Sequence, residues 1–232
     1  MTGSCPLFAT ASEESLVGSE AGLSDQHGGR YARQERHSKE TTVEVELCID
    51  GPGCNGCAAP GSVEVSTGLP FFDHMLAQLG RHGGFGLSIR ATGDLEVDAH
   101  HTVEDVGIVL GAVLAKAMAD KAGVRRFASI ALPLDEALVE VALDLSGRPY
   151  LSYGLEFPTD TPPLGNPPFD PQLAEEFWRA FVTASGITLH VVMRSGRNTH
   201  HILEASFKAA ARCLRDALQR EGSVIPSTKG ML

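Results

Sequence analysis

The chain has 232 residues, which is enough for one large domain or two small ones. Its formal net charge of −10 argues against nonspecific nucleic-acid binding as its main function, so we expect no nucleic-acid partner. We also expect no membrane partner and a cytoplasmic location. No apolar run approaches the roughly 18–20 residues of a membrane span, and the N-terminus lacks the pattern of a signal or transit peptide.

The five cysteines are an odd number, which is typical of a protein in a reducing compartment. Cys54 and Cys57 form a CxxC pair, but no second pair completes a zinc site and no redox context surrounds it. Glycines and prolines flank the pair, so we interpret 51–61 as a loop insertion.

Residues 1–35 are rich in Ser, Gly, Glu and Ala without apolar periodicity, so we expect a flexible N-terminal extension before one domain at 36–232. Alternating apolar residues predict strands, and apolar residues at helical spacing predict helices. The elements predicted for the first half are strands at 41–50 and 62–67, a helix from Pro70 to Gly83-Gly84, a strand at 86–97 with a possible hairpin about Gly93-Asp94, and a long helix that begins at His100-His101.

The second half repeats this order. A loop at 158–168 contains five prolines and cannot be regular structure. The predicted elements are strands at 137–145 and 150–157, a helix at 172–184, a strand at 187–193, and a last helix that begins at His200-His201.

The matching order suggests an internal duplication. Gly86 corresponds to Gly186, and the same offset separates each glycine from the histidine pair that follows it. We therefore predict an α+β fold made of two duplicated ββαβα halves, at about 40–125 and 135–221, with a C-terminal loop at 222–232. The sheets should pack side by side, with the helices on one face.

The histidine pairs form a duplicated motif, His-His-x-x-Glu. Positions i and i+4 share one face of a helix, so His100 with Glu104, and His200 with Glu204, can each bind one metal ion. His101 and His201 point about 100° away and should reach a second ion or a neighbouring chain. A single such pair is usually a solvated helix face, but a solvated face has no reason to recur in register.

Two further histidines have apolar neighbours, where an imidazole needs a partner: His74 in FFDHML and His190 in GITLHVV. Imidazole and carboxylate ligands together suit Mn²⁺, Fe²⁺ or Zn²⁺. Basic residues and the terminal IPSTKG segment could form a phosphate pocket, although such a tail by itself is usually frayed.

Several segments, in order, resemble the imidazoleglycerol-phosphate dehydratase family. They are RHSKET (36–41), FFDHMLAQLGRHG (71–83), GDLEVDAHHTVED (93–105), PLDEAL (133–138), DLSGRPYL (144–151), SGITLH (185–190), the motif at His200 and IPSTKG (225–230). The resemblance implies a fold like ribosomal protein S5 domain 2. It implies a hydro-lyase of L-histidine biosynthesis that converts a phosphorylated imidazole, D-erythro-imidazole-glycerol phosphate, to imidazole-acetol phosphate. It also implies two Mn²⁺ ions per active site and a homo-oligomeric shell, a 24-mer built from trimers.

Carried over by motif, the implied metal ligands are His74, His100, His101, Glu104, His190, His200, His201 and Glu204. We group His100, Glu104, His190 and His201 around one ion, and His74, His101, His200 and Glu204 around the other. The implied substrate and phosphate contacts are Glu40, Gln78, Arg126, Arg148, Lys208, Ser227 and Lys229. The implied catalytic residues are Glu40, His100, Glu104 and Glu204, with Asp135 a weaker candidate.

The mechanism we expect begins with an imidazole held between two cations, which loses its N–H proton and expels the neighbouring hydroxyl. Glu40 then takes the activated C–H proton, giving an enol that becomes the ketone. Two other functions stay open from the residues alone. A non-catalytic metal-binding shell would explain the duplication but not the basic tail. A dinuclear metal hydrolase would usually have bridging carboxylates rather than this imidazole-rich set.

Overall fold

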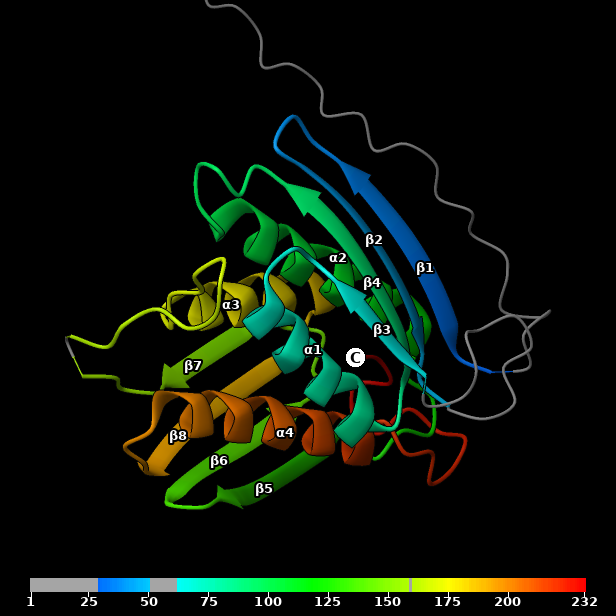
Figure 1. Cartoon of the computed structure of the whole chain (residues 1–232). Helices are drawn as coiled ribbons and strands as arrows, with labels where there is room; N and C mark the ends of the chain where they lie inside the picture. Colours follow the sequence, from blue (N-terminus) through cyan, green and yellow to red (C-terminus); the bar gives the residue numbers. More distant parts are fainter. Residues whose placement is uncertain (1–28, 51–61, 159) are drawn as a thin grey trace, which may run out of the picture.

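The structure, a computed structural model, describes residues 29–50, 62–158 and 160–232 (Figure 1). Most of the predicted N-terminal extension and the predicted Cys54–Cys57 loop lie outside the described residues.

Two four-stranded sheets with one topology make up the strands of the fold. The first contains β1 (Tyr31–His37), β2 (Thr41–Cys48), β3 (Val63–Ser66) and β4 (Gly86–Gly93) in the order β1-β2-β4-β3. The second contains β5 (Phe127–Leu134), β6 (Ala137–Asp144), β7 (Tyr150–Gly154) and β8 (Thr188–Ser195) in the order β5-β6-β8-β7. In each sheet only the last pair, β3–β4 or β7–β8, is parallel. The two sheets confirm the predicted duplication.

The four helices begin and end close to where the sequence predicts. They are α1 (Pro70–Gly83), α2 (His100–Met118), α3 (Leu173–Ser185) and α4 (Thr199–Ala217). Pro70 begins α1 without the loss of a hydrogen bond, because the N–H groups of the first helical residues have no acceptor within the helix. Gly84 ends it at φ 70°, a left-handed conformation that favours glycine. Asn198 caps α4 by accepting a hydrogen bond from the backbone N–H of His201.

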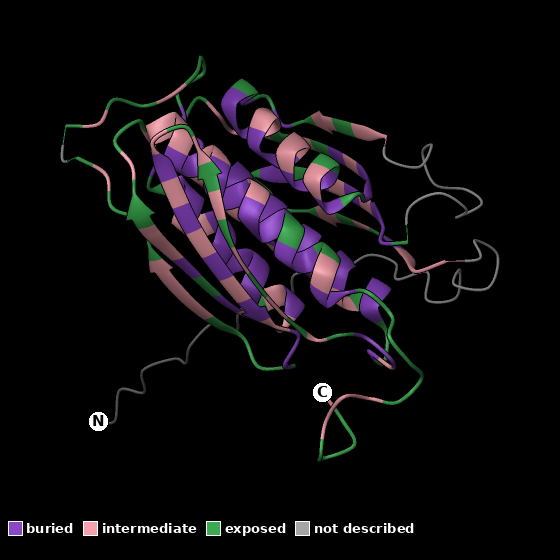
Figure 2. Cartoon of the chain, turned by 90° about the horizontal axis from the view of Figure 1, so that it is seen from below, coloured by how far each residue is buried: buried purple, intermediate pink, exposed green. Residues whose placement is uncertain are grey.

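The helices lie between the two sheets (Figure 1). α1 and α2 pack on the first sheet, α3 and α4 on the second, and the two helix layers meet through α2 with α3 and α1 with α4. Helices on one face of each sheet match the prediction. The expectation that the sheets pack side by side is wrong, because each half buries its apolar helix faces against the helices of the other half. Figure 2 shows the buried residues concentrated on these helices and the strand faces turned toward them.

Small residues allow the two halves to approach closely. A Cβ atom on Gly107 would lie 2.7 Å from the carbonyl oxygen of Phe177, and one on Gly111 would lie 2.5 Å from that of Phe181. Behind this contact, Phe177 stacks on Phe207, with ring centroids 5.4 Å apart. The α2–α3 and α1–α4 contacts therefore join the halves into one hydrophobic core.

Three sequence expectations need correction. β1 begins at Tyr31, so the boundary predicted at residue 35 falls inside a strand, and β5 precedes the predicted start of the second half. Each half is therefore βββαβα rather than ββαβα. Strand β4 ends at Gly93, without the hairpin considered at Gly93-Asp94. β1 was missed because Ala32 is its one buried residue, which leaves no apolar alternation.

Two further observations bear on the expected environment of the chain. Cys48 is disulfide-bonded, whereas Cys213 is a buried free thiol, so the expectation of reduced cysteines holds for Cys213 and fails for Cys48. Within the described ranges, none of the helices has the length and apolar character needed to cross a membrane.

Candidate metal and phosphate site

Three predicted metal ligands converge where α1 meets α4. Nε2 of His200 lies 2.9 Å from Oε2 of Glu204, and Nε2 of His74 lies 3.3 Å from the same oxygen. One candidate ligand atom from each residue lies within 4.8 Å of the other two. Two imidazoles and one carboxylate facing one point are a donor set that suits a divalent transition metal. The helical contact between the two halves therefore completes a site that neither half holds alone.

Neighbouring side chains orient this group, which we call the α1–α4 triad (His74, His200 and Glu204). Nδ1 of His74 lies 3.3 Å from the amide nitrogen of Gln78, one turn along α1. The His200 ring meets Phe71 edge to face, with centroids 5.3 Å apart. The Gln78 contact is made at Nδ1 of His74, and the Nε2 atoms of both imidazoles face the carboxylate of Glu204.

Glu204 is negatively charged across the physiological range. Burial alone would raise its pKa, but hydrogen bonds from Lys208, His74 and His200 outweigh burial and lower the pKa to about 2. Nζ of Lys208 lies 2.7 Å from Oε1. The resemblance implies Lys208 as a phosphate contact, whereas the structure places its ammonium against Glu204.

The second histidine of each pair has a carboxylate partner of its own. Nδ1 of His101 lies 3.0 Å from Oδ2 of Asp94, and Nδ1 of His201 lies 2.8 Å from Oε2 of Glu136. The hydrogen bond that Nδ1 of His101 donates to Asp94 raises the pKa of His101, and the one that Nδ1 of His201 donates to Glu136 raises the pKa of His201. The hydrogen bond from His201 in turn lowers the pKa of Glu136 to about 2. Glu40 lies near this arrangement, with Oε2 at 3.8 Å from Nδ1 of His101.

The structure brings together some of the predicted ligands and not others. The triad contains three members of one predicted group, but the fourth, His101, is not among them. The other group, His100, Glu104, His190 and His201, does not converge: in the part of the chain that the structure describes, the triad is the one such cluster. His100 lines a cavity of about 300 Å³ with Asp98, Asp170 and Glu176, and His190 on β8 is exposed beside the ring of Tyr150.

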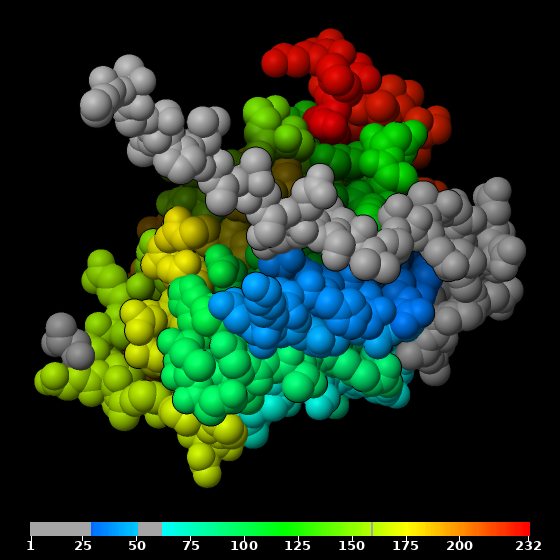
Figure 3. Space-filling model, turned by 90° about the horizontal axis from the view of Figure 1, so that it is seen from above, coloured from blue at the N-terminus to red at the C-terminus, as the bar shows by residue number. Residues whose placement is uncertain are grey.

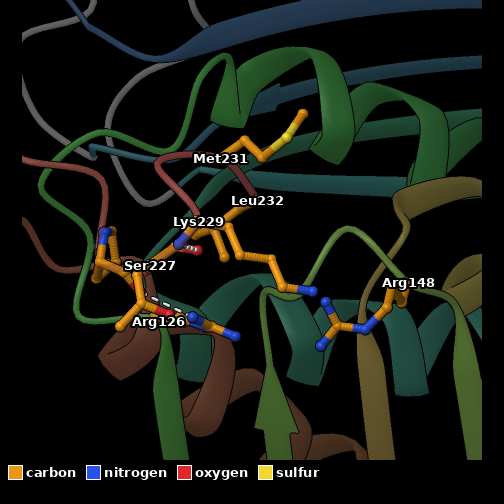
Figure 4. Close-up of a pocket in the computed structure, with 8 residues that line it drawn as sticks. Arg126, Arg148, Ser227, Lys229, Met231 and Leu232 are labelled. Carbon is orange, nitrogen blue, oxygen red and sulfur yellow. Dashed lines mark hydrogen bonds between the residues drawn. The ribbon is translucent and has the colours of Figure 1, made fainter.

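A basic cavity of about 530 Å³ lies at the C-terminal end of the chain. Four of the predicted phosphate contacts line it: Arg126, Arg148, Ser227 and Lys229. Figure 4 shows the side chains of Arg126, Lys229 and Arg148 reaching toward one another from the start of β5, the C-terminal segment and the β6–β7 turn. In the space-filling view the C-terminal residues, in red, rise from one end of the surface (Figure 3). Three cationic side chains from separate segments form a pocket suited to a phosphate.

Arg126 is fixed in this cavity by two partners. Its Nε donates to Oδ1 of Asp144 at 2.7 Å, and its Nη1 donates to the carbonyl oxygen of Pro226 at 2.7 Å. The hydrogen bond to Asp144 raises the pKa of Arg126. The bond to Pro226 ties the C-terminal segment to β5, so the predicted loop at 222–232 forms one wall of the cavity. Among the residues that line it, neither Lys208 nor Gln78 appears.

Sequence reasoning missed Asp94 and Glu136 as partners of the histidines. Each is acidic and lies at a turn next to a strand end, after β4 in one half and before β6 in the other. Asp94 was considered only as a turn residue, and Asp135, the neighbour of Glu136, only as a weak candidate. A search for carboxylates in the turn before each histidine pair would have found Asp94, whereas Glu136 lies in the β5–β6 turn, far from α4 in the chain.

Known proteins of one family match most of this chain. The family model for imidazoleglycerol-phosphate dehydratase matches residues 67–214. A protein of that name from Anaeromyxobacter sp. (strain Fw109-5) is 52% identical over 88% of this chain and 96% of its own length. The chloroplastic imidazoleglycerol-phosphate dehydratase 1 of Arabidopsis thaliana is 47% identical over 88% of this chain and 72% of its own length.

Solved structures show the same similarity. The crystal structure of imidazoleglycerol-phosphate dehydratase from Staphylococcus aureus superposes with a TM-score of 0.69 at 34% identity, covering 82% of this chain and 99% of that one. The enzyme from Pyrococcus furiosus, crystallised in complex with (S)-C348, superposes with a TM-score of 0.67 at 32% identity, covering 86% of this chain and all of that one.

Proposed function

This chain belongs to the imidazoleglycerol-phosphate dehydratase family, and from that premise we propose how its residues carry out the reaction. The chain is a hydro-lyase of histidine biosynthesis. We propose that the substrate is D-erythro-1-(imidazol-4-yl)glycerol 3-phosphate and the product 3-(imidazol-4-yl)-2-oxopropyl phosphate. The balanced change is loss of one C–H proton and the adjacent hydroxyl as water, after which the enol tautomerises to the ketone.

The α1–α4 triad is the observation that carries this proposal. His74, His200 and Glu204 would hold one divalent cation, and Mn²⁺ suits their imidazole and carboxylate donors. His101, which does not lie in the triad, would be the fourth ligand of this ion, as the family resemblance implies. A bound cation would supply Lewis acidity, which lowers the pKa of an imidazole N–H that it contacts. The chain's own contribution is orientation, because Gln78 and Phe71 hold the two imidazoles with Nε2 toward the carboxylate.

A second Mn²⁺ per active site is part of the proposal. Its ligands would be His100, Glu104, His190 and His201, as the family resemblance implies. These four residues do not form a cluster within the described part of one chain. We propose that neighbouring subunits bring them together. The exposure of His190 on the outer face of β8 is consistent with a partner chain reaching it.

The basic cavity would hold the substrate phosphate. Arg126 is anchored by Asp144, so its remaining N–H groups have a fixed direction. Arg148 and Lys229 reach into the same space (Figure 4). Three cations around a dianion fix its position and thereby orient the imidazole end of the molecule.

Glu40 is the proposed acid–base residue. It lies in the turn between β1 and β2, its side chain is 55% exposed, and its carboxylate is 3.8 Å from His101. A carboxylate open to the solvent side and next to a proposed ligand can reach a proton on a bound substrate. In this proposal Glu40 accepts the C–H proton after the hydroxyl has left, while His100, Glu104 and Glu204 act as ligands in the catalytic centre.

We propose that the protein works in the cytoplasm as a homo-oligomer, a 24-subunit shell built from trimers. Phe127 and Tyr150 on the second sheet are more than half exposed, and large exposed apolar side chains are typical of surfaces that a partner covers. The net charge of −10 supports a small-molecule substrate rather than nucleic acid.

One assay tests the function directly. Purified protein is incubated with Mn²⁺ and imidazoleglycerol phosphate, and the ketone product is measured. Formation of the ketone supports the proposal. Metal binding without product would instead indicate a metal-binding shell. Release of inorganic phosphate would indicate a hydrolase.

A further inference from the structure

We propose that Asp94 and Glu136 are positioning residues that hold Nδ1 of His101 and His201, so that each imidazole presents Nε2 to a metal ion. We also infer that Asp94 performs in the first half the role that Glu136 performs in the second, and that this leaves Glu40 available for chemistry. The inference rests on the proposed function in one respect, namely that His101 and His201 are metal ligands.

The hydrogen bonds select one tautomer at each histidine. The carboxylate of Asp94 lies 3.0 Å and 3.2 Å from Nδ1 of His101 through its two oxygens, and Oε2 of Glu136 lies 2.8 Å from Nδ1 of His201. A carboxylate can only accept, so Nδ1 carries a proton, and in the neutral imidazole the Nε2 lone pair is free. A carboxylate behind an imidazole is the usual arrangement for a histidine that ligates a metal through its other nitrogen. Asp135, which is 75% exposed, lies 3.8 Å from Nε2 of His201, beyond hydrogen-bond distance, so its carboxylate does not hold a proton on Nε2.

Glu136 is itself held in place. Its Oε1 accepts hydrogen bonds from the backbone N–H groups of Asn198 at 2.8 Å and Arg197 at 3.2 Å, while Oε2 faces His201. Asn198 in turn caps α4 at the backbone of His201. One carboxylate therefore connects the start of β6, the loop before α4 and the imidazole of His201.

In the two halves, carboxylates from different positions bond Nδ1 of the second histidine. Glu136 directly precedes β6, and Glu40 directly precedes β2, so the two glutamates have equivalent places in the two sheets. Glu136 bonds its histidine, whereas Glu40 stays 3.8 Å from His101. In the first half Asp94, directly after β4, bonds His101 instead. The residue directly after β8 is Gly196, which has no side chain to do the same.

Two equivalent carboxylates thus have different roles. Because Asp94 satisfies Nδ1 of His101, Glu40 is not needed to hold the imidazole. Its side chain is 55% exposed, compared with 29% for Glu136. The geometry points to a division of labour in which Glu136 and Asp94 orient ligands and Glu40 transfers a proton.

The test measures Mn²⁺ affinity separately from activity. The full-length protein is stripped with EDTA and titrated with Mn²⁺, with free Mn²⁺ followed by electron paramagnetic resonance. Asp94→Ala and Glu136→Ala should each weaken Mn²⁺ binding by about 10–100-fold, because loss of a carboxylate behind a ligating histidine typically has that effect. Glu40→Ala should stay within about twofold of wild type while losing turnover. Absorption spectra of the Co²⁺-loaded protein should change in the first two variants and not in the third.

Glu35→Ala is the matched control. Oε1 of Glu35 lies 2.9 Å from Nε2 of His37, an exposed carboxylate–histidine pair whose histidine is not a proposed ligand. Its Mn²⁺ affinity should equal that of wild type. If an alanine variant fails to fold, Asp94→Asn and Glu136→Gln, which keep the shape and remove the charge, replace it, with an expected loss of about tenfold.

The possible failures are distinguishable. Wild-type affinity in the Asp94 or Glu136 variants would overturn the inference and leave the proposed function standing. Equal weakening by Glu40→Ala and Asp94→Ala would overturn the division of labour. Wild-type protein that binds no Mn²⁺ would contradict the proposed function itself, and that result precedes any variant.

Discussion

Lys208 lies one turn after Glu204 on α4, and its ammonium is 2.7 Å from Oε1 of Glu204. Oε2 of the same carboxylate faces His74 and His200. One carboxylate thus connects the chain's own cation to the proposed metal ligands. Because Lys208 already neutralises one oxygen, a cation at the triad would be bound mainly through the other. The residue that the family resemblance implies as a phosphate contact therefore also helps to keep Glu204, a proposed metal ligand, negatively charged.

Lys208→Met should raise the pKa of Glu204, because the variant removes the hydrogen bond and the positive charge that help to lower it. Burial, which favours the neutral carboxyl of Glu204, is then opposed only by the hydrogen bonds from His74 and His200. The pKa can be followed by infrared absorption of the carboxylate in the metal-free protein. An unchanged carboxylate titration in Lys208→Met would show that this contact does not form in solution.

The stability of the metal-free protein should depend on Glu204 at acid pH. Its folded-state pKa of about 2 lies below the ordinary value of 4.5, so its partners stabilise the fold above about pH 4.5, and that contribution is lost as the pH falls through about 2. We expect wild-type protein to be more stable than Glu204→Gln by about 1–3 kcal/mol at neutral pH, and this difference in unfolding free energy should become smaller as the pH falls. Denaturant unfolding in the presence of EDTA measures it. A difference that stays constant down to pH 2 would contradict the assignment.

Glu40→Gln should retain Mn²⁺ and substrate binding while turnover falls by about 10²–10⁴-fold, the usual contribution of a general acid–base residue. The amide keeps the size of the side chain but cannot accept the proton. Steady-state kcat and isothermal titration with substrate measure the two effects separately. Near-normal kcat would remove Glu40 from the mechanism.

Lys229→Met should raise KM by about 10–100-fold with a smaller effect on stability, because a charge-assisted hydrogen bond to phosphate is lost. Arg126→Met should raise KM similarly and also lower the melting temperature, because Asp144 loses its bidentate partner. Arg194→Met, which removes an exposed ion pair with Glu140 on the same sheet, is the control and should change neither quantity. Equal KM values for Lys229→Met and wild type would place the phosphate elsewhere.

Gly107→Val should destabilise the fold by about 1–3 kcal/mol, since its new Cβ would lie 2.7 Å from the carbonyl oxygen of Phe177 and 2.9 Å from Cβ of Ala180. This substitution tests the α2–α3 contact that joins the halves. Lys116→Val, at an exposed position on the same helix, controls for the lower helix propensity of valine. Similar unfolding free energies for the two variants would mean that the helices can separate without cost.

The parts of the fold that follow local rules could be predicted from sequence. Apolar spacing in α2 and α4 and the proline that begins α1 gave the helices to within a few residues, and the repeated histidine pairs revealed the duplication. β5 has alternating inward residues, Ala128, Ile130, Leu132 and Leu134, yet Pro133 and the short turn before β6 obscured it. The placement of the helices between the sheets depends on which faces cover one another, and local periodicity carries no such information.

The candidate site shows the same limit. Residue types identified His74, His200 and Glu204, because an imidazole in an apolar segment and a helical i, i+4 pair are local features. Their convergence depends on the contact between α1 and α4, which lie about 130 residues apart in the chain. The roles of Asp94 and Glu136 depend on turn geometry at the ends of β4 and β6. Sequence symmetry also suggested placing His101 with the triad, but it did not reveal that Nδ1 of His101 is bonded to Asp94.

The most direct test of the central claim is anomalous diffraction at the manganese edge from crystals of protein with demonstrated dehydratase activity. We predict a peak within ligand distance of His74, His200 and Glu204. Active crystals with no anomalous signal between these three side chains would contradict it.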